Sequence, residues 1–83
     1  PPLVAMSTTT LLVRNIPPNF TPAKCRETFS GVPGTRFLNF VLHDSGSGYL
    51  MYATRDDCEE TMNHFRASVL RLCYRESARC DYP

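Results

Sequence analysis

The chain has 83 residues, a formal net charge of +1 and 42% hydrophobic residues, which bounds it to one small domain and excludes a disordered tail. No apolar run approaches the roughly 18 residues that span a bilayer, and the N-terminus lacks the pattern of a signal peptide. A sequence pI of 8.2 is below that of strongly basic phosphate binders, so a nucleic-acid role would depend on local patches.

Residues 1–8 are predicted to be an N-terminal tail or linker, because two prolines open it and no periodicity follows. Residues 9–16 are rich in strand-forming side chains and predict a first strand that ends at Pro17. Alternation along this strand predicts two faces, one with Leu11, Val13 and Asn15 and the other with Leu12, Arg14 and Ile16.

A helix is predicted from Pro22 to about Ser30, because Thr21 is a suitable N-cap and proline is favoured at the first helical position. Cys25 and Phe29 lie four residues apart and are expected to face the core. Gly31 ends this helix.

Residues 35–43 predict a second strand and residues 49–53 a third, joined by the Gly- and Ser-rich segment 44–48 as a hairpin. Both faces of the second strand are partly apolar, so the pattern does not set its register. Phe37 and Phe40 are therefore interchangeable candidates for the sheet surface.

A second helix is predicted over 57–66, capped by Asp56, with its other acids solvated in the first turns. Its buried stripe is predicted to hold Cys58, Thr61, Met62 and Phe65. Residues 69–75 alternate as a fourth strand, and residues 77–83 are predicted to be a C-terminal tail or linker after a domain of residues 9–76. The fourth strand is expected to place Leu70, Leu72 and Tyr74 on one face and Arg71, Cys73 and Arg75 on the other.

The order of elements is βαββαβ, which is typical of the split-βαβ, ferredoxin-like α+β sandwich. This fold is a four-stranded antiparallel sheet with two helices packed on one face. The other face stays open to solvent or to a partner, so its side chains are the first place to look for function.

No metal site or cofactor is expected, because the four cysteines include no Cys-x-x-Cys pair. Two disulfides would be possible in number, but small apolar cysteines within predicted helices favour reduced thiols. Reduced thiols imply an intracellular, reducing compartment; nucleus, cytoplasm and mitochondrion are not distinguished. These cysteines are Cys25, Cys58, Cys73 and Cys80.

Two stretches resemble the signatures of the RNA recognition motif (RRM) family. Residues 11–16 (LLVRNI) are similar to the family's hexamer on its first strand, and residues 45–52 (SGSGYLMY) to its octamer on the third. Cys58 falls where the family has a small residue on its second helix, and the resemblance spans about residues 9–75. The family binds single-stranded RNA by stacking bases on aromatic rings of the open sheet.

The resemblance implies a weak or atypical platform, because Leu12 and Ser47 stand where the family has two of its three rings and only Tyr49 remains. It implies a single-stranded RNA-binding module, not an enzyme, within a larger ribonucleoprotein or RNA-processing factor. Among branches of the family, the Ile-Pro-Pro stretch and the missing rings are similar to mitochondrial RNA-editing accessory proteins. Uracil-rich or pyrimidine-tolerant RNA is the expected ligand.

The predicted RNA contacts follow from the chemistry of each side chain. Tyr49 would stack on a base, arginines would contact phosphates or bases, amides would read base edges and apolar groups would add contact area. The candidates are Tyr49, Arg14, Leu12, Asn15, Ser47, Met51, Arg71, Arg75, Phe37, Asn39 and His43.

Two alternatives stay open beside RNA binding. The same fold could serve as a protein–protein interaction or homodimerisation domain, with an interface of Leu12, Phe37, Val41 and Met51. A small enzyme of the acylphosphatase type is remote, because no Gly-rich anion loop leads into the first helix. His43 and Asp44 are adjacent but have no nucleophile placed to complete a triad. Neither a membrane nor a small-molecule substrate is expected.

The small net charge hides a predicted polarity. The acids gather on the proposed helices, whereas the proposed strands carry arginines and no acid. This arrangement predicts a mildly basic open face and modest RNA binding with a shallow salt dependence. The acids are Glu27, Asp56, Asp57, Glu59 and Glu60, and the arginines are Arg14, Arg71 and Arg75.

Overall fold

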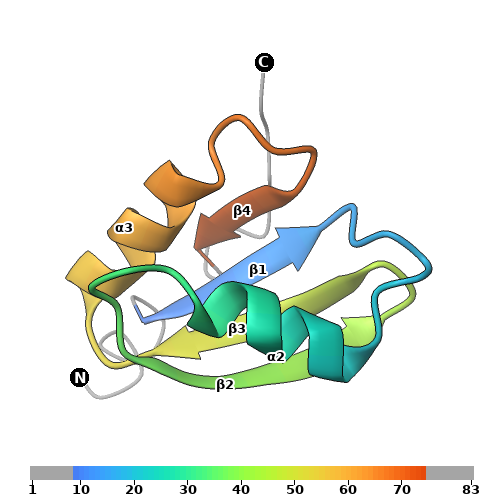
Figure 1. Cartoon of the computed structure of the whole chain (residues 1–83), viewed down its shortest axis with the longest axis horizontal. Helices are drawn as coiled ribbons and strands as arrows, with labels where there is room; N and C mark the ends of the chain where they lie inside the picture. The colour runs from blue at the N-terminus through green and yellow to red at the C-terminus, as the bar shows by residue number, and fades with distance from the viewer. Residues whose placement is uncertain (1–8, 75–83) are drawn as a thin grey trace.

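The computed structural model describes residues 9–74, and within them the predicted βαββαβ order is confirmed (Figure 1). The four strands form one antiparallel sheet in the order β2-β3-β1-β4, and both helices lie on the same face of it. Predictions for the two tails, Arg75 and Cys80 fall outside the described residues. The elements are β1 (Thr10–Arg14), α2 (Pro22–Ser30), β2 (Phe37–Asp44), β3 (Ser47–Tyr52), α3 (Arg55–His64) and β4 (Arg71–Tyr74).

The hydrophobic core fills the space between the sheet and the two helices. Phe29 of α2 lies at its centre, with its ring centroid 6.4 Å from that of Phe40 and 5.1 Å from that of Phe65. The Tyr52 hydroxyl donates to the Phe29 carbonyl oxygen at 3.0 Å, which ties β3 to the end of α2. The remaining buried members are Leu11, Val13, Ile16, Cys25, Leu50, Cys58, Leu70 and Leu72.

The alternation predicted for the first strand fails at its end. Asn15 has a φ of 64°, a left-handed conformation that asparagine tolerates better than most residues. This turn returns Ile16 to the core side, where it is buried, and its N–H donates to the Gly46 carbonyl oxygen at 3.0 Å. The prediction that Ile16 shares a face with Leu12 and Arg14 is therefore wrong.

A register shift in β2 settles which face of that strand is exposed. Phe37 pairs with Tyr52 and Phe40 pairs with Leu50, with the irregularity between Phe37 and Asn39. Because paired residues of an antiparallel ladder share a face, both phenylalanines point toward the helices. The Phe37 ring lies 5.6 Å from the Tyr52 ring.

The β2–β3 hairpin is tighter than the sequence predicts, because its loop is only Ser45 and Gly46. Gly46 has a φ of +85°, which suits glycine in a two-residue hairpin turn. In β3, Gly48 leaves room for the Phe40 ring: a Cβ there would lie 2.5 Å from the Phe40 Cε1 atom. Glycine at this position is therefore required by packing of the core.

The first helix begins as predicted, since the Thr21 hydroxyl accepts from the Lys24 N–H. The second helix begins earlier than predicted: Thr54, not Asp56, is its cap and accepts from the Asp57 N–H at 3.1 Å. Asp57 is buried rather than solvated and lies 3.8 Å from Arg36.

Neither helix within residues 9–74 is long and apolar enough to cross a membrane. Three cysteines of this part are free thiols, as the sequence predicts. Burial raises the pKa of the Cys58 thiol to about 12.

Candidate nucleic-acid interface

The strand registers show which side chains share the open face of the sheet. Leu12 at the centre of β1 pairs with Tyr49 on one side and with Cys73 on the other. Tyr49 also pairs with Val41 of β2. One row across the open face therefore carries a single aromatic ring beside aliphatic and thiol groups.

The neighbouring rows differ in chemistry. Toward the start of β1, Thr10 pairs with Met51, which pairs in turn with Asn39. Toward its end, Arg14 pairs directly with Arg71. The two arginines therefore lie opposite each other on the same face, a like-charge pairing that destabilises a sheet.

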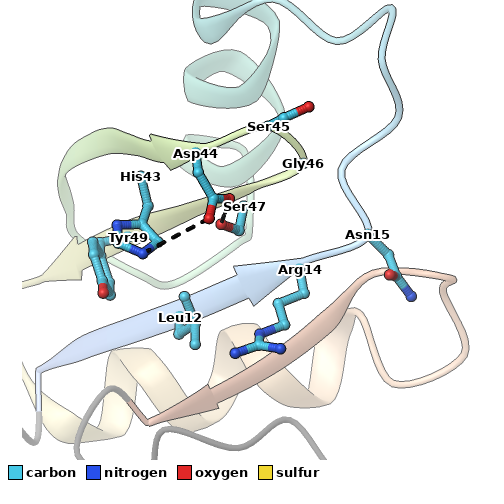
Figure 2. A pocket seen from close by; sticks show the side chains of 9 residues that line it. All are labelled: Leu12, Arg14, Asn15, His43, Asp44, Ser45, Gly46, Ser47 and Tyr49. Carbon is cyan, nitrogen blue, oxygen red and sulfur yellow. Dashed lines mark hydrogen bonds and ion pairs between the residues drawn. The ribbon is translucent and has the colours of Figure 1, made fainter.

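A groove of about 460 Å³ opens at this second end, between the last residues of β1 and the β2–β3 hairpin (Figure 2). It brings together six of the predicted RNA contacts and three hairpin residues that are not among them. The lining residues are Leu12, Arg14, Asn15, His43, Asp44, Ser45, Gly46, Ser47 and Tyr49.

One side of the groove is an aromatic pair. The His43 and Tyr49 rings have centroids 5.0 Å apart and are tilted by 55° (Figure 2). Tyr49 is half-buried and His43 is exposed. These rings offer flat π-faces to a base, although two of the family's three ring positions hold Leu12 and Ser47.

Asp44 is absent from the predicted contacts, because the predicted second strand ends before it. The strand continues through Asp44, so the prediction that the strands carry no acid is wrong. The Ser47 hydroxyl donates to Asp44 Oδ1, and His43 Nε2 lies 4.0 Å from Asp44 Oδ2. The position of Asp44 directly before a Gly-containing turn is the sequence signal that could have placed it beside a tight hairpin.

The histidine, aspartate and serine of the hairpin do not form a catalytic triad. In a triad the serine donates to the histidine, which the carboxylate orients from its other nitrogen. Here the Ser47 hydroxyl donates to the Asp44 carboxylate itself, and Ser47 is buried. This hydrogen bond therefore orients the Asp44 carboxylate within the groove.

Arg14 is the most accessible cation of the groove. Its side chain is exposed and forms no ion pair with any residue of 9–74. Figure 2 shows it across the groove from His43 and Tyr49. Arg71 lies beside it on β4 and is partly buried. A phosphate here would meet the Arg14 guanidinium, whose geometry suits bidentate contacts.

The two predicted amide readers have structural partners. Asn15 Nδ2 donates to the Val69 carbonyl oxygen at 3.2 Å, and Asn39 Oδ1 accepts from the Phe40 N–H at 2.9 Å. Arg26 donates to the Phe40 carbonyl oxygen at 3.3 Å. Side chains therefore satisfy both backbone groups of Phe40 on this edge strand.

The remaining predicted contacts divide by position. Met51 is on the open face but outside the groove, and Leu12 is only 6% exposed, so it offers little surface. Phe37 is not on the open face, because it packs against the core beside Tyr52. The placement of Phe37 on the open sheet surface, on which its inclusion among the RNA contacts and in the alternative protein interface depends, is therefore wrong.

Within the part of the chain that the structure describes, no group of three or more His, Cys, Asp or Glu side chains could hold a metal ion. The groove itself is lined by two rings, one arginine, one carboxylate, one amide and the hydroxyls of Ser45 and Ser47.

Comparison with known proteins shows the fold. No protein-family model matches the chain, and no curated protein sequence matches it. A solved structure described as a complex structure of two RRM domains is similar over 94% of this chain and 98% of its own, with a TM-score of 0.69 and 10% identity. A second, described as a complex of two RRM domains, covers 92% and 94%, with a TM-score of 0.66 and 8% identity. At these identities the similarity is one of fold, and the fold is RRM-like.

Proposed function

We propose that this domain is a binding module for single-stranded RNA and not an enzyme. The observation that carries the proposal is the grouping of Tyr49, His43 and Arg14 around one groove on the uncovered face of an RRM-like sheet. Stacking of a base on an aromatic ring is worth about 1–3 kcal/mol, and an adjacent guanidinium holds the phosphate that follows. The groove offers both kinds of contact.

The binding is expected to be modest. Leu12 and Ser47 stand at two of the usual ring positions and both are buried, so Tyr49 is the main stacking group and His43 its neighbour. Asp44 in the groove weakens electrostatic attraction of phosphates. These features support micromolar rather than nanomolar affinity and a shallow dependence on salt.

The setting of this activity belongs to the same proposal. We propose that the domain is part of a larger RNA-processing or ribonucleoprotein factor in a reducing compartment, with pyrimidine-rich RNA as a ligand. Free thiols at Cys25, Cys58 and Cys73 support a reducing compartment. The pyrimidine preference stays a prediction from the sequence.

The experiment is a titration of the domain with fluorescently labelled oligo-U, oligo-A and an RNA duplex, combined with NMR of the Tyr49 ring and Arg14 side-chain resonances. Single strands are expected to bind, to shift both sets of resonances and to bind more tightly than the duplex. Tyr49→Ala should weaken binding at least fivefold, which is about 1 kcal/mol, while the domain stays folded.

His64→Ala is the matched control, because it removes an exposed ring from α3 on the opposite side of the sheet. It should leave RNA binding unchanged. The proposal is wrong if neither Tyr49 nor Arg14 resonances respond at submillimolar RNA, or if the two variants weaken binding equally.

Protein association is the second candidate, because β2 exposes three large aliphatic side chains at the edge of the sheet. Leu38 is 64% exposed, Leu42 is 55% exposed and Val41 is 42% exposed. Both solved structures that resemble this chain are described as complexes of two RRM domains. Side-chain contacts are favoured over strand addition, since Asn39 and Arg26 occupy the backbone groups of Phe40.

A mass measurement in solution separates the two candidates. A dimer that dissociates on Leu38→Ser or Leu42→Ser substitution would support association, whereas RNA binding by a monomer supports the first proposal. Competition between RNA and dimerisation would show that the two kinds of binding exclude each other.

A further inference from the structure

We propose that the groove binds a guanine base, which Asp44 recognises by accepting two hydrogen bonds from its Watson–Crick edge. This inference rests on the proposed RNA binding and names the base at one position of the strand. The neighbouring positions, where the sequence predicts tolerance of pyrimidines, are separate from it.

The acceptors that Asp44 has left are the first reason. Its Oδ1 accepts from the Ser47 hydroxyl, which orients the carboxylate and closes the hairpin. Its Oδ2 accepts no hydrogen bond from residues 9–74 and lies 4.0 Å from His43 Nε2. The side chain is 66% exposed and lines the groove. An ionised carboxylate has about four lone-pair sites and no donor, so most of its capacity is still available to a ligand.

The four bases differ in what they present to such a group. Guanine carries two adjacent donors, N1–H and N2–H, on one edge, which match the two oxygens of a carboxylate. Adenine and cytosine each place one amino donor beside an acceptor nitrogen, and uracil places one N–H between two carbonyl oxygens. Those acceptors would face the negative charge of Asp44 and be repelled. Guanine is therefore the one base whose Watson–Crick edge fits without an opposed acceptor.

The rest of the groove fits a stacked base in this position. The Tyr49 and His43 rings lie on the same side of the groove as Asp44, and Arg14 lies across from them (Figure 2). A base stacked on the Tyr49 ring, with His43 beside it, would present its edge to Asp44, while its phosphate could reach Arg14. The volume of about 460 Å³ is ample for one nucleotide.

A purely structural role accounts for only part of the geometry. Asp44 stabilises the hairpin through Oδ1 and Ser47, and a neutral asparagine could accept the same bond. A negative charge on a face that meets phosphates opposes binding unless it contacts a base. Recognition of a base edge gives that charge a favourable role.

The test uses four RNA pentamers that differ only at the central position: guanine, inosine, adenine or uracil between uridines. We expect the wild-type domain to bind the guanine pentamer about tenfold more tightly than the uracil or adenine pentamer, which corresponds to about 1.4 kcal/mol. Inosine lacks the 2-amino group and should lose about half of that free energy, roughly threefold in affinity.

Asp44→Asn keeps the acceptor for Ser47 and should reduce the preference for guanine to less than about twofold. The readout is the ratio between pentamers, because removal of a negative charge raises affinity for every RNA. Ser47→Ala leaves the carboxylate but frees its orientation, and should reduce the ratio by a smaller factor. Glu60→Gln removes the same charge from the exposed surface of α3 and should leave the ratio unchanged.

The outcomes separate this inference from the function on which it rests. Pentamers bound with equal affinity, or a guanine preference unchanged in Asp44→Asn, would overturn the guanine site and leave RNA binding in place. A preference for uracil at the central position would do the same. No binding of any pentamer would overturn both proposals, and circular dichroism of each variant confirms that the domain is folded.

Discussion

The two faces of the sheet follow different rules, although the same strands build both. On the covered face, Leu11, Val13 and Leu50 are fully buried and fit against the two helices. On the open face, the paired residues are an arginine opposite an arginine and a tyrosine opposite a leucine. Side chains on the covered face must fit the space between the sheet and the helices, whereas those on the open face are free to contact a ligand. Substitutions on the covered face should therefore lower stability, and substitutions on the open face should alter binding.

The open face is itself divided. At the start of β1, Thr10, Met51 and Asn39 form a row without a formal charge. At the hairpin end, Arg14 and Asp44 line a groove together with an aromatic pair. Charge and aromaticity therefore coincide at one end, which is why the proposed site is placed there and not over the whole sheet.

The largest expected effect is a loss of stability from a substitution at Gly48, where the covered face is most closely packed. Gly48→Ala places a Cβ 2.5 Å from the Phe40 ring and 2.9 Å from the Val41 carbonyl oxygen. Neither the buried ring nor the backbone can move freely, so we expect a loss of about 3 kcal/mol in the free energy of unfolding. In a domain of this size that loss lowers the Tm by roughly 15 °C, as differential scanning calorimetry would measure.

Gly31→Ala is the matched control. A Cβ at Gly31 would meet the Glu27 carbonyl oxygen at 3.4 Å, which is an ordinary contact. Its Tm should change by only a few degrees. Equal losses in the two variants would mean that the steric fit of Gly48 against Phe40 is not what limits this position.

The second-largest expected effect is a loss of stability at alkaline pH, because ionisable groups are buried on the covered face. Burial raises the pKa of Tyr52, Cys58 and Tyr74 to about 12, from ordinary values of 10.0, 9.0 and 10.0 respectively. The unfolded chain therefore releases these protons at lower pH than the folded domain. Stability is full below about pH 9 and falls as the pH rises toward 12.

The measurement is the Tm between pH 8 and pH 11, with an expected fall of roughly 5–10 °C. Burial raises the pKa of two thiols from an ordinary value of 9.0, Cys25 and Cys58. Cys58→Ala removes one of them, so the Tm of this variant should fall less between pH 9 and pH 10 than that of the wild type. A Tm that stays constant up to pH 11 would contradict the buried setting of these groups.

The sequence predicts the covered face better than the open one, for a physical reason. Helix starts, the order of elements and the core positions Cys25, Phe29 and Leu72 follow from periodicity and caps that act locally. The errors at Ile16 and Phe37 arise where the backbone leaves its regular repeat, at the left-handed Asn15 and at the β2 register shift. A pattern with a period of two cannot show an inserted residue.

The sequence predicts the candidate site only in part. Tyr49, His43 and Arg14 follow from a motif and from residue type, and the groove contains all three. Asp44 does not, because its importance depends on how far β2 extends into the hairpin. The hydrogen bonds of Asn15 and Asn39 to backbone groups are tertiary or local details that no spacing reveals.

Substitutions of Asn15 distinguish a structural role of this residue from a role in RNA binding. Asn15→Ala should lower the free energy of unfolding by about 1–2 kcal/mol, since alanine is strained at a φ of 64° and cannot donate to Val69. Asn15→Gly accepts this φ and should cost less, about 0.5–1 kcal/mol. Chemical denaturation measures both, and RNA affinity of the folded variants should change less than twofold. A large loss of affinity in both variants would instead support a base-reading role.

The smallest expected effect separates stability from binding at the arginine pair. Arg14→Gln relieves the like-charge pairing of β1 and β4, so the free energy of unfolding should rise by a few tenths of a kcal/mol. RNA affinity should fall about threefold. The slope of log affinity against log salt should become shallower by about 0.7 for each phosphate that the domain no longer neutralises.

Arg66→Gln removes the same charge after the end of α3 and should change neither the slope nor the affinity. Opposite signs for stability and binding in Arg14→Gln would show that this pairing is tolerated for the sake of an anionic ligand. If stability and affinity fell together, the arginines would be structural. The phosphate contacts on the open face would then have to come from other cations.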